Sequence, residues 1–246
     1  MNFLIDLGNS RLKWAQHGPG LWRADAVSLD SEKNFGALLE MAWGKIAKPQ
    51  RVIVCSVSSP ELLRAVEQWA QARWSVTAHV VRPQAQHLGV KNLYRRPEQL
   101  GADRWAALIG ARGLTASAAC VVDAGTAVTV EALSAKGEFL GGAIFPGLRL
   151  LRDSLARGTE ALPGVTGNAT DCLGRSTEEA IAAGTLFGLA GAVERLIEEY
   201  RRMLGEPIQV FLTGGDAPVL AAQLRVEHTP VPDLVLKGLA RIADSL

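Results

Sequence analysis

Two short stretches of the sequence place an aspartate, a glycine and a polar residue directly after an apolar run. The first, Asp6–Ser10, follows Phe3–Ile5. The second, Asp123–Thr126, follows Ala118–Val122. Glycine lets a ligand approach the main chain, and turn amides and hydroxyls donate hydrogen bonds to phosphate oxygens. An aspartate repels phosphate but can hold a cation that neutralises it. These residue types indicate phosphate binding.

The two stretches lie 117 positions apart, and over that offset Gly8 aligns with Gly125 and Asn9 with Thr126. Either stretch alone is explained by a hairpin whose Asp and Gly serve only the turn. Two copies at matching places favour phosphate binding instead. They predict two related halves that face a shared ligand.

Three other stretches could contribute to a site, each with a structural alternative. Thr213–Asp216 has a glycine pair that would let adenosine or ribose lie against bare backbone, and Gly141–Gly147 would join a strand end to an anion-binding helix start. Ordinary turns explain both nearly as well. Gly101–Arg104 could combine a proton acceptor with a carboxylate-binding arginine. Spacing alone favours a helix-capping Asp103 beside a surface Arg104. Lys13 is either a phosphate contact or a solvated strand residue.

Composition limits the class of protein. The chain has 246 residues, of which 48% are hydrophobic and 21% charged, so it is long enough for one large or two medium domains with a substantial core. A net charge of +1 provides no bulk field for nucleic acid or anionic lipid, so neither is expected as a partner. The sequence contains neither G-x-x-x-x-G-K-[ST] nor a post-strand G-x-G-x-x-G.

The three cysteines are scattered and include no C-x-x-C pair, which argues against a disulfide framework or a zinc site. Cys55 and Cys120 lie in apolar runs and are expected in the core, whereas Cys172 lies in a polar loop. No uninterrupted apolar run reaches the length of a membrane span. A reducing cytoplasm is therefore expected.

The apolar patterning predicts alternating strands and helices, with a boundary near 113–117. In the first half it predicts strands at 2–7, 11–16, 21–28, 51–56 and 76–81, helices at 31–46, 60–73 and 103–112, and a long irregular stretch at 82–99. In the second half it predicts strands at 118–122, 127–133, 138–144, 208–212 and 226–228, helices from about 146 to 157 and at 177–203, 217–223 and 233–242, and a loop at 158–174.

Taken together, these stretches resemble the type III pantothenate kinases, also called the Bvg accessory factor family. The matching pieces span almost the whole chain in family order: Asp6–Lys13, Tyr94, Gly101–Arg104, Asp123–Thr126, Gly141–Gly147, Thr159–Pro163, Ser176–Gly184 and Thr213–Asp216. The resemblance implies an α/β fold of the acetate and sugar kinase/actin type. Its two duplicated ribonuclease-H-like halves, 1–115 and 116–246, would hold a nucleotide in the cleft between them.

The resemblance also implies roles for individual residues. Asp103 would be the catalytic base, and Asp123 would hold a monovalent cation, potassium or ammonium. The ATP contacts would be Asp6, Leu7, Gly8, Asn9, Ser10, Arg11, Leu12, Lys13, Thr126, Gly214 and Gly215. The pantothenate contacts would be Tyr94, Gly101, Ala102, Asp103, Arg104 and Thr177, the last supplied across a homodimer interface.

The implied activity is phosphorylation of pantothenate by ATP and Mg²⁺ to give 4′-phosphopantothenate, the first step of coenzyme A biosynthesis. Two alternatives remain at this point. One is a kinase of the same superfamily that acts on a sugar or another small alcohol. The other is a nucleotide-binding regulatory protein without turnover.

Overall fold

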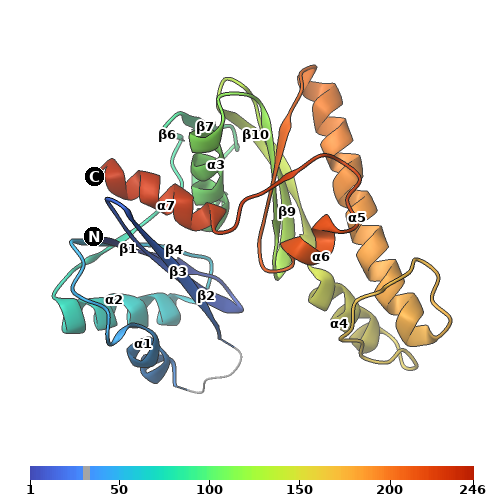
Figure 1. The fold of residues 1–246 in the computed structure, drawn as a ribbon, viewed down its shortest axis with the longest axis horizontal. Helices are drawn as coiled ribbons and strands as arrows, with labels where there is room; N and C mark the ends of the chain where they lie inside the picture. The colour runs from blue at the N-terminus through green and yellow to red at the C-terminus, as the bar shows by residue number, and fades with distance from the viewer. Residues whose placement is uncertain (30–33) are drawn as a thin grey trace. The chain divides into compact units, whose positions relative to one another are not determined.

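The computed structural model describes residues 1–29 and 34–246, and it divides into two compact units (Figure 1). Unit 1 consists of Met1–Leu114 with Asp233–Leu246, and unit 2 consists of Thr115–Pro232. The predicted second half ran to residue 246. The last helix instead belongs to unit 1, because it packs on helix α3 (Ala102–Leu114) of that unit.

Unit 1 is built on a five-stranded sheet of order β3-β2-β1-β4-β5. The strands are β1 (Asn2–Leu7), β2 (Arg11–Gly18), β3 (Leu21–Ser28), β4 (Arg51–Ser56) and β5 (Ala78–Val80). The central strand β1 is buried along its whole length, which explains why most of its residues are apolar. It pairs antiparallel with β2 and parallel with β4, so β2 and β4 both supply neighbours to each β1 residue.

Helices cover both faces of this sheet (Figure 1). On one face α1 (Phe35–Trp43) and α2 (Pro60–Trp74) bury Trp43 and Trp74 against Phe3 of β1. On the other face lie α3 (Ala102–Leu114) and α7 (Leu234–Asp244). The predicted start of α2 is confirmed, because the Ser59 hydroxyl accepts a hydrogen bond from Leu62 N and Pro60 is the first helical residue.

Unit 2 repeats the strand order of unit 1. Its strands run β10-β9-β8-β11-β12, with β8 antiparallel to β9 and parallel to β11, as β1 is to β2 and β4. These strands are β8 (Ala119–Ala124), β9 (Ala127–Leu133), β10 (Glu138–Pro146), β11 (Gln209–Thr213) and β12 (Thr229–Pro230). Both units therefore have the ribonuclease-H-like arrangement, and the prediction of duplicated halves from the two turn sequences is confirmed at the level of topology.

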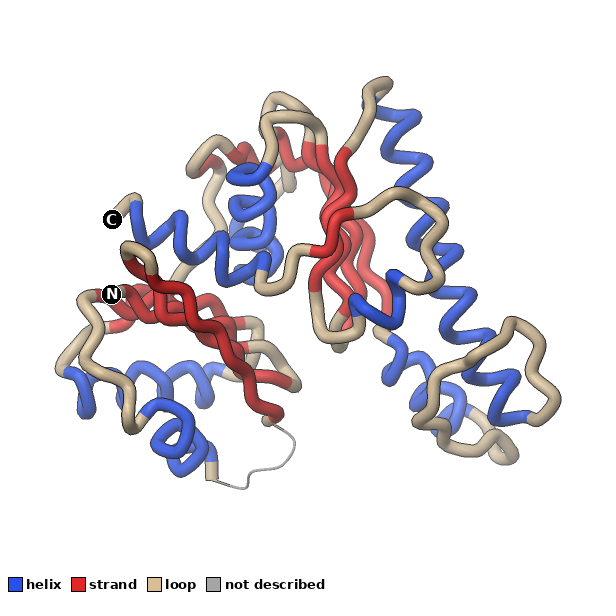
Figure 2. The backbone as a smooth tube through the Cα atoms, in the orientation of Figure 1, coloured by secondary structure: helices blue, strands red, loops and turns tan. Residues whose placement is uncertain are grey.

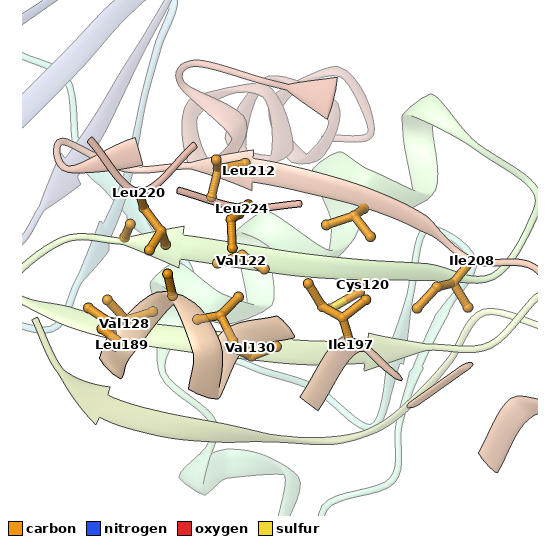
Figure 3. Close-up of a cluster of buried hydrophobic side chains, with 14 of the residues drawn as sticks. Cys120, Val122, Val128, Val130, Leu189, Ile197, Ile208, Leu212, Leu220 and Leu224 are labelled. Carbon is orange, nitrogen blue, oxygen red and sulfur yellow. The ribbon is translucent and has the colours of Figure 1, made fainter. Parts of the chain in front are cut away.

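Three helices complete unit 2: α4 (Leu148–Gly158), α5 (Thr177–Leu204) and α6 (Ala217–Ala221). Figure 3 shows Ile197 of α5 and Val122, Val130 and Leu212 of the sheet in one buried apolar cluster. Helix α5 contains an 18-residue window of mean hydropathy 1.5, and 50% of that window is buried inside the protein. Its hydrophobicity is explained by this core position.

Two local predictions were wrong. The stretch 82–99 is not irregular throughout, because it forms the hairpin β6 (Gln86–His87) and β7 (Val90–Asn92) and the short 3₁₀ helix η1 (Pro97–Gln99). Leu88 and Gly89 make the hairpin turn with positive φ, a conformation that the leucine gave no reason to expect. The strand predicted at 226–228 lies instead at Thr229–Pro230, where it pairs with β11.

Helix α1 begins at Phe35, after the Asn34 side chain caps its first turn, and it is shorter than the predicted 31–46. The predicted start at 31–33 lies outside the described residues.

Helices α3 and α7 lie against each other (Figure 2). Their closest approach is at two glycines. A Cβ on Gly238 would lie 1.8 Å from the Ala106 carbonyl oxygen, and one on Gly110 would lie 2.6 Å from the Leu234 carbonyl oxygen. The opposing atoms belong to the backbone and cannot rotate away. The close crossing therefore requires glycine at both positions.

We expect Gly238→Ala to lower the free energy of unfolding by about 3 kcal/mol, because the added methyl group must separate two packed helices. Urea denaturation followed by circular dichroism measures this change. Gly36→Ala in α1 is the matched control, since its Cβ would come no closer than 3.4 Å to any described atom. Equal stability of the two variants would contradict the close crossing.

Candidate functional site

Asp6 lies near the end of β1, between a lysine and a cysteine on the two neighbouring strands. Its register partners are Lys13 in β2 and Cys55 in β4. The Lys13 ammonium lies 3.7 Å from Asp6 Oδ2, and the Cys55 thiol donates to Asp6 Oδ1 at 3.6 Å. Lys13 is thus directed at a buried carboxylate, which argues against the alternative of a simply solvated strand residue.

Two carboxylates share this part of unit 1. Burial raises the pKa of Asp6, the positive charge of Lys13 opposes that rise, and the negative charge of Asp103 adds to it. Burial also raises the pKa of Asp103, against the lowering effects of the Arg104 N–H, the Arg104 charge and Lys13. Because Lys13 acts on both carboxylates and Asp103 acts on Asp6, these three residues form one electrostatic cluster.

The hairpin turn that follows Asp6 is closed by a hydrogen bond from Gly8 N to the Arg11 carbonyl at 3.1 Å. Asn9 and Arg11 are exposed, whereas Gly8 and Ser10 are half-buried. Leu7 and Leu12 are fully buried in the core of unit 1. The side chains of these two leucines are therefore not available to a ligand, and packing explains why both positions are apolar.

Asp103 and Arg104 stand in the first turn of α3. Arg104 is 8% exposed and its guanidinium lies 5.6 Å from the centre of the Tyr94 ring. The alternative of a surface arginine beside a capping aspartate is therefore wrong for Arg104. Sequence spacing could not show this, because the Tyr94 ring comes from the segment before η1.

Gly101 and Asn92 hold this arrangement in place. A Cβ on Gly101 would lie 2.6 Å from Asp103 Oδ1, so any other residue would crowd the carboxylate. The Asn92 side chain accepts from Tyr94 N at 3.0 Å and donates to the Pro97 carbonyl at 3.1 Å. Asn92 is 5% exposed and was not among the predicted site residues. Its signal in the sequence was an amide two residues before Tyr94, in the long stretch 82–99.

In unit 2 the second aspartate turn packs against two other predicted stretches. Gly214 has φ +102°, and a Cβ there would lie 2.5 Å from Asp123 Oδ1 and 2.2 Å from the Ala124 carbonyl oxygen. A Cβ on Gly147 would lie 2.1 Å from the Gly125 carbonyl oxygen. The stretches 123–126, 141–147 and 213–216, separate in sequence, thus meet at one end of the sheet.

The surroundings of Asp123 differ from those of Asp6. The register partners of Asp123 are Thr129 in β9 and Thr213 in β11, where Asp6 has Lys13 and Cys55. Carbonyl oxygens of the turn lie close by, as the crowding at Gly147 and Gly214 shows. Carboxylate and carbonyl oxygens are the ligands that hard cations prefer. This donor set fits a cation better than it fits a phosphate.

Arg152 of α4 is a buried arginine that sequence reasoning missed. Its guanidinium donates to Thr185 Oγ1 of α5 at 3.3 Å and to Asn168 Oδ1 at 3.0 Å. Burial lowers its pKa, and the negative charge of Asp216 raises it. Arg152 therefore links α4, α5, the loop before α5 and the Thr213–Asp216 stretch. No local pattern distinguishes it from the solvated arginines of an amphipathic helix.

Thr177, the first residue of α5, lies at an apolar groove of about 640 Å³ in unit 2. The helix is capped by Ser176, whose hydroxyl accepts from Glu179 N. Apolar side chains of β10, α4 and α5 line much of the groove, among them Phe145, Leu151, Leu155, Ile181 and Leu189. Gly184 and Gly188 also line it, and a Cβ on either would meet no described atom within 4 Å.

The predicted residues thus form separate groups within the units. Unit 1 contains the 6–13 turn with Lys13, and Tyr94 with Gly101, Ala102, Asp103 and Arg104. Unit 2 contains Asp123, Thr126, Gly214 and Gly215 at its sheet end, and Thr177 at the groove. Among the residues that the structure describes, no three His, Cys, Asp or Glu side chains form a metal-binding cluster.

Comparisons of the sequence with known proteins match one family. A family profile described as type III pantothenate kinase matches residues 2–199. The type III pantothenate kinase of Halorhodospira halophila is 43% identical over 245 residues, which cover 97% of this chain and 96% of that protein.

Solved structures agree on the fold. A Campylobacter jejuni protein of the Baf family has a TM-score of 0.62 at 22% identity, over 99% of this chain and 98% of that one. The activator of 2-hydroxyisocaproyl-CoA dehydratase from Clostridium difficile, solved with bound ADPNP, has a TM-score of 0.55 at 13% identity. That comparison covers 99% of this chain and 94% of the activator. The fold is that of the acetate and sugar kinases and actin.

Proposed function

Because this chain belongs to the type III pantothenate kinase family, we propose that Asp103 is the proton acceptor in its phosphorylation of pantothenate. The enzyme transfers the γ-phosphoryl group of ATP to pantothenate and so begins coenzyme A biosynthesis. The observation that carries the assignment of Asp103 is its half-enclosed carboxylate. Gly101 leaves it uncovered, and Arg104, held against Tyr94, stands beside it.

Phosphoryl transfer depends mainly on positioning and charge neutralisation. Asp103 would orient the primary hydroxyl of pantothenate and accept its proton late in the transfer. A raised pKa makes a carboxylate a better proton acceptor, provided that it is still ionised at the working pH. Arg104 would bind the pantothenate carboxylate, and Tyr94, Gly101 and Ala102 would complete the pocket.

ATP would be bound by both aspartate turns. From unit 1 the backbone of Asp6–Lys13 would contact the phosphates, with the Lys13 ammonium neutralising part of their charge. From unit 2 the Thr126 hydroxyl would donate to them, and Gly214 and Gly215 would lie against the adenosine.

Mg²⁺ would be bound mainly by the phosphates of ATP and by water, as is common in kinases. When bound, it supplies positive charge that offsets the charge of the triphosphate. A monovalent cation, potassium or ammonium, would be held by Asp123 and the turn carbonyls beside Gly214. The uncharged register partners of Asp123, Thr129 and Thr213, support this assignment.

A homodimer would use the groove beside Thr177. The apolar lining and the open faces of Gly184 and Gly188 suit the close approach of a second copy, which would bring its own Thr177 to the partner's pantothenate. Cytoplasmic localisation is proposed from the three free cysteines, since reduced thiols persist in that compartment.

The overall assignment is tested by a coupled assay of ADP release with pantothenate, sugars and other small alcohols as acceptors. Among these acceptors, we expect ADP release only with pantothenate. Phosphorylation of a sugar but not of pantothenate would support the related-kinase alternative, and ATP binding without ADP release would support the regulatory one.

We expect Asp103→Asn to lower kcat by about 10²–10⁴-fold, because the amide cannot accept the proton. Binding of ATP, measured by calorimetry, should change little, since Asn preserves the shape of the side chain. Near-normal turnover would remove Asp103 from the role of proton acceptor.

The pH dependence gives a second measurement on the same residue. Because burial raises the pKa of Asp103, kcat/KM should fall on the acid side through a pKa above the ordinary aspartate value of 3.8. This acid limb should be absent from the residual activity of Asp103→Asn.

We expect Asp123→Ala to abolish the response to potassium, because the cation loses its only charged ligand among the residues proposed to hold it. Thermal melting with ATP present should rise with KCl for the unmodified protein but not for the variant, with sodium chloride at equal ionic strength as the control. An undiminished potassium response in the variant would place the cation elsewhere.

We expect Gly188→Glu to produce monomers in sedimentation experiments, because a carboxylate would be buried in the apolar groove. KM for pantothenate should rise as the partner's Thr177 is lost. Met203→Glu, at the exposed far end of the same helix, is the control and should remain dimeric. A dimeric Gly188→Glu protein would exclude the groove as the interface.

A further inference from the structure

Cys55 is a fully buried thiol that touches the phosphate-binding turn, and the mechanism above gives it no role. It lies on β4, in register with Asp6 of β1. Its sulfur donates to Asp6 Oδ1 at 3.6 Å, within the range of a hydrogen bond from sulfur. Its apolar run predicts only a small core residue at this position.

The chemistry of this thiol suits a hydrogen-bond donor and not a nucleophile. Burial raises its pKa, and the negative charges of Asp6 and Asp103 raise it further. A reactive cysteine needs an exposed, electropositive setting, which is the opposite of these surroundings. The thiol therefore keeps its proton at neutral pH and offers it to the carboxylate.

The contact completes a fixed arrangement around Asp6. Lys13 approaches Oδ2 from β2, and Cys55 donates to Oδ1 from β4 on the opposite side. With both oxygens held from neighbouring strands, the plane of the carboxylate is set. Removal of the thiol would free Oδ1 and let the Asp6–Lys13 pair rotate.

Unit 2 has a corresponding pair at the same place in its sheet. Asp123 of β8 is in register with Thr213 of β11, the strand that corresponds to β4. Thr213 is 3% exposed and is also a small residue with a donor group. A small donor residue thus stands beside the strand-end aspartate on the parallel neighbour in both copies of the fold, where a purely apolar core would favour valine or isoleucine.

We propose that Cys55 is a positioning residue, whose thiol holds the Asp6 carboxylate so that Lys13 stays aligned for the phosphates of ATP. The proposal rests on the proposed function of the Asp6–Lys13 turn. Cys55 does not touch ATP itself, and its effect is transmitted through Asp6 and Lys13.

The test compares Cys55→Ala, which removes the donor, with Cys55→Ser, which retains one, and Cys55→Val, which fills the space without one. For Cys55→Ala and Cys55→Val we expect kcat/KM for ATP to fall about tenfold, the loss typical of one hydrogen bond to a charged group. KM for pantothenate should change less than about twofold. Cys55→Ser should recover most of the activity, because its hydroxyl is a stronger donor with a slightly shorter reach.

Cys120→Ala is the matched control. Cys120 is equally buried, on β8 of unit 2, and the raised pKa of its thiol is due first to burial. Its removal should lower the melting temperature as much as Cys55→Ala does, with kcat/KM for ATP unchanged. Equal kinetic losses in the two alanine variants would reduce Cys55 to a packing residue and overturn the proposal.

A double-mutant cycle separates this inference from the proposed function. In an Asp6→Asn background Cys55→Ala should have little further effect on kcat/KM for ATP, because both changes disrupt the same contact. Fully additive losses would overturn the inference. If Asp6→Asn is inactive while Cys55→Ala and Cys55→Val are normal, the inference alone fails. An Asp6→Asn variant with normal activity would overturn both.

Discussion

The free-energy cost of removing carboxylates from water governs the chemistry of unit 1. Burial raises the pKa of both Asp6 and Asp103, the negative charge of Asp103 raises the pKa of Asp6 further, and the Lys13 ammonium opposes the rise for both carboxylates. A cluster of this kind is unfavourable for stability in the absence of ligand, because burial disfavours the charged form of both carboxylates. In the proposed mechanism this cost serves function, because a carboxylate with a raised pKa is a better proton acceptor and a pre-placed ammonium would meet a phosphate without reorganisation.

Glycines leave room beside the carboxylate oxygens of Asp103 and Asp123. Gly101 leaves Asp103 Oδ1 free of a side chain, and Gly214 does the same for Asp123 Oδ1. Gly147 lets α4 begin directly against the Gly125 carbonyl. In each case the nearest atom to an added methyl group would be an oxygen. These positions are therefore explained by access to oxygen atoms, and only Gly214 among them also needs a positive φ.

The two units share one strand arrangement around an aspartate but differ in the charge of the residues beside it. In both, a central strand ends at an aspartate that is flanked by an antiparallel hairpin partner and a parallel strand. In unit 1 the flanking residues are Lys13 and Cys55, so the carboxylate is neutralised within the protein. In unit 2 they are Thr129 and Thr213, which provide hydroxyls and no charge. The same register position can thus hold a charged pair in one unit and suit a bound cation in the other.

The local features of this protein were determined by the sequence itself. The two aspartate–glycine turns, the Ser59–Pro60 helix start and the repeated succession of strands and helices along the chain could be predicted, because turns, caps and apolar periodicity depend on residues close together in the chain. The order of the strands within each sheet was implied only by the family resemblance. The family resemblance identified the same turns as functional.

Only the tertiary structure decided which of these residues meet. The Cys55 contact with Asp6 depends on pairing between strands 49 residues apart, and the burial of Arg104 depends on Tyr94 from another segment. The three residues with which Arg152 interacts, Thr185, Asn168 and Asp216, come from separate elements of unit 2. Burial and charge neighbours are properties of the packed chain, so the pKa values and side-chain contacts that shape the site could not be read from the order of residues.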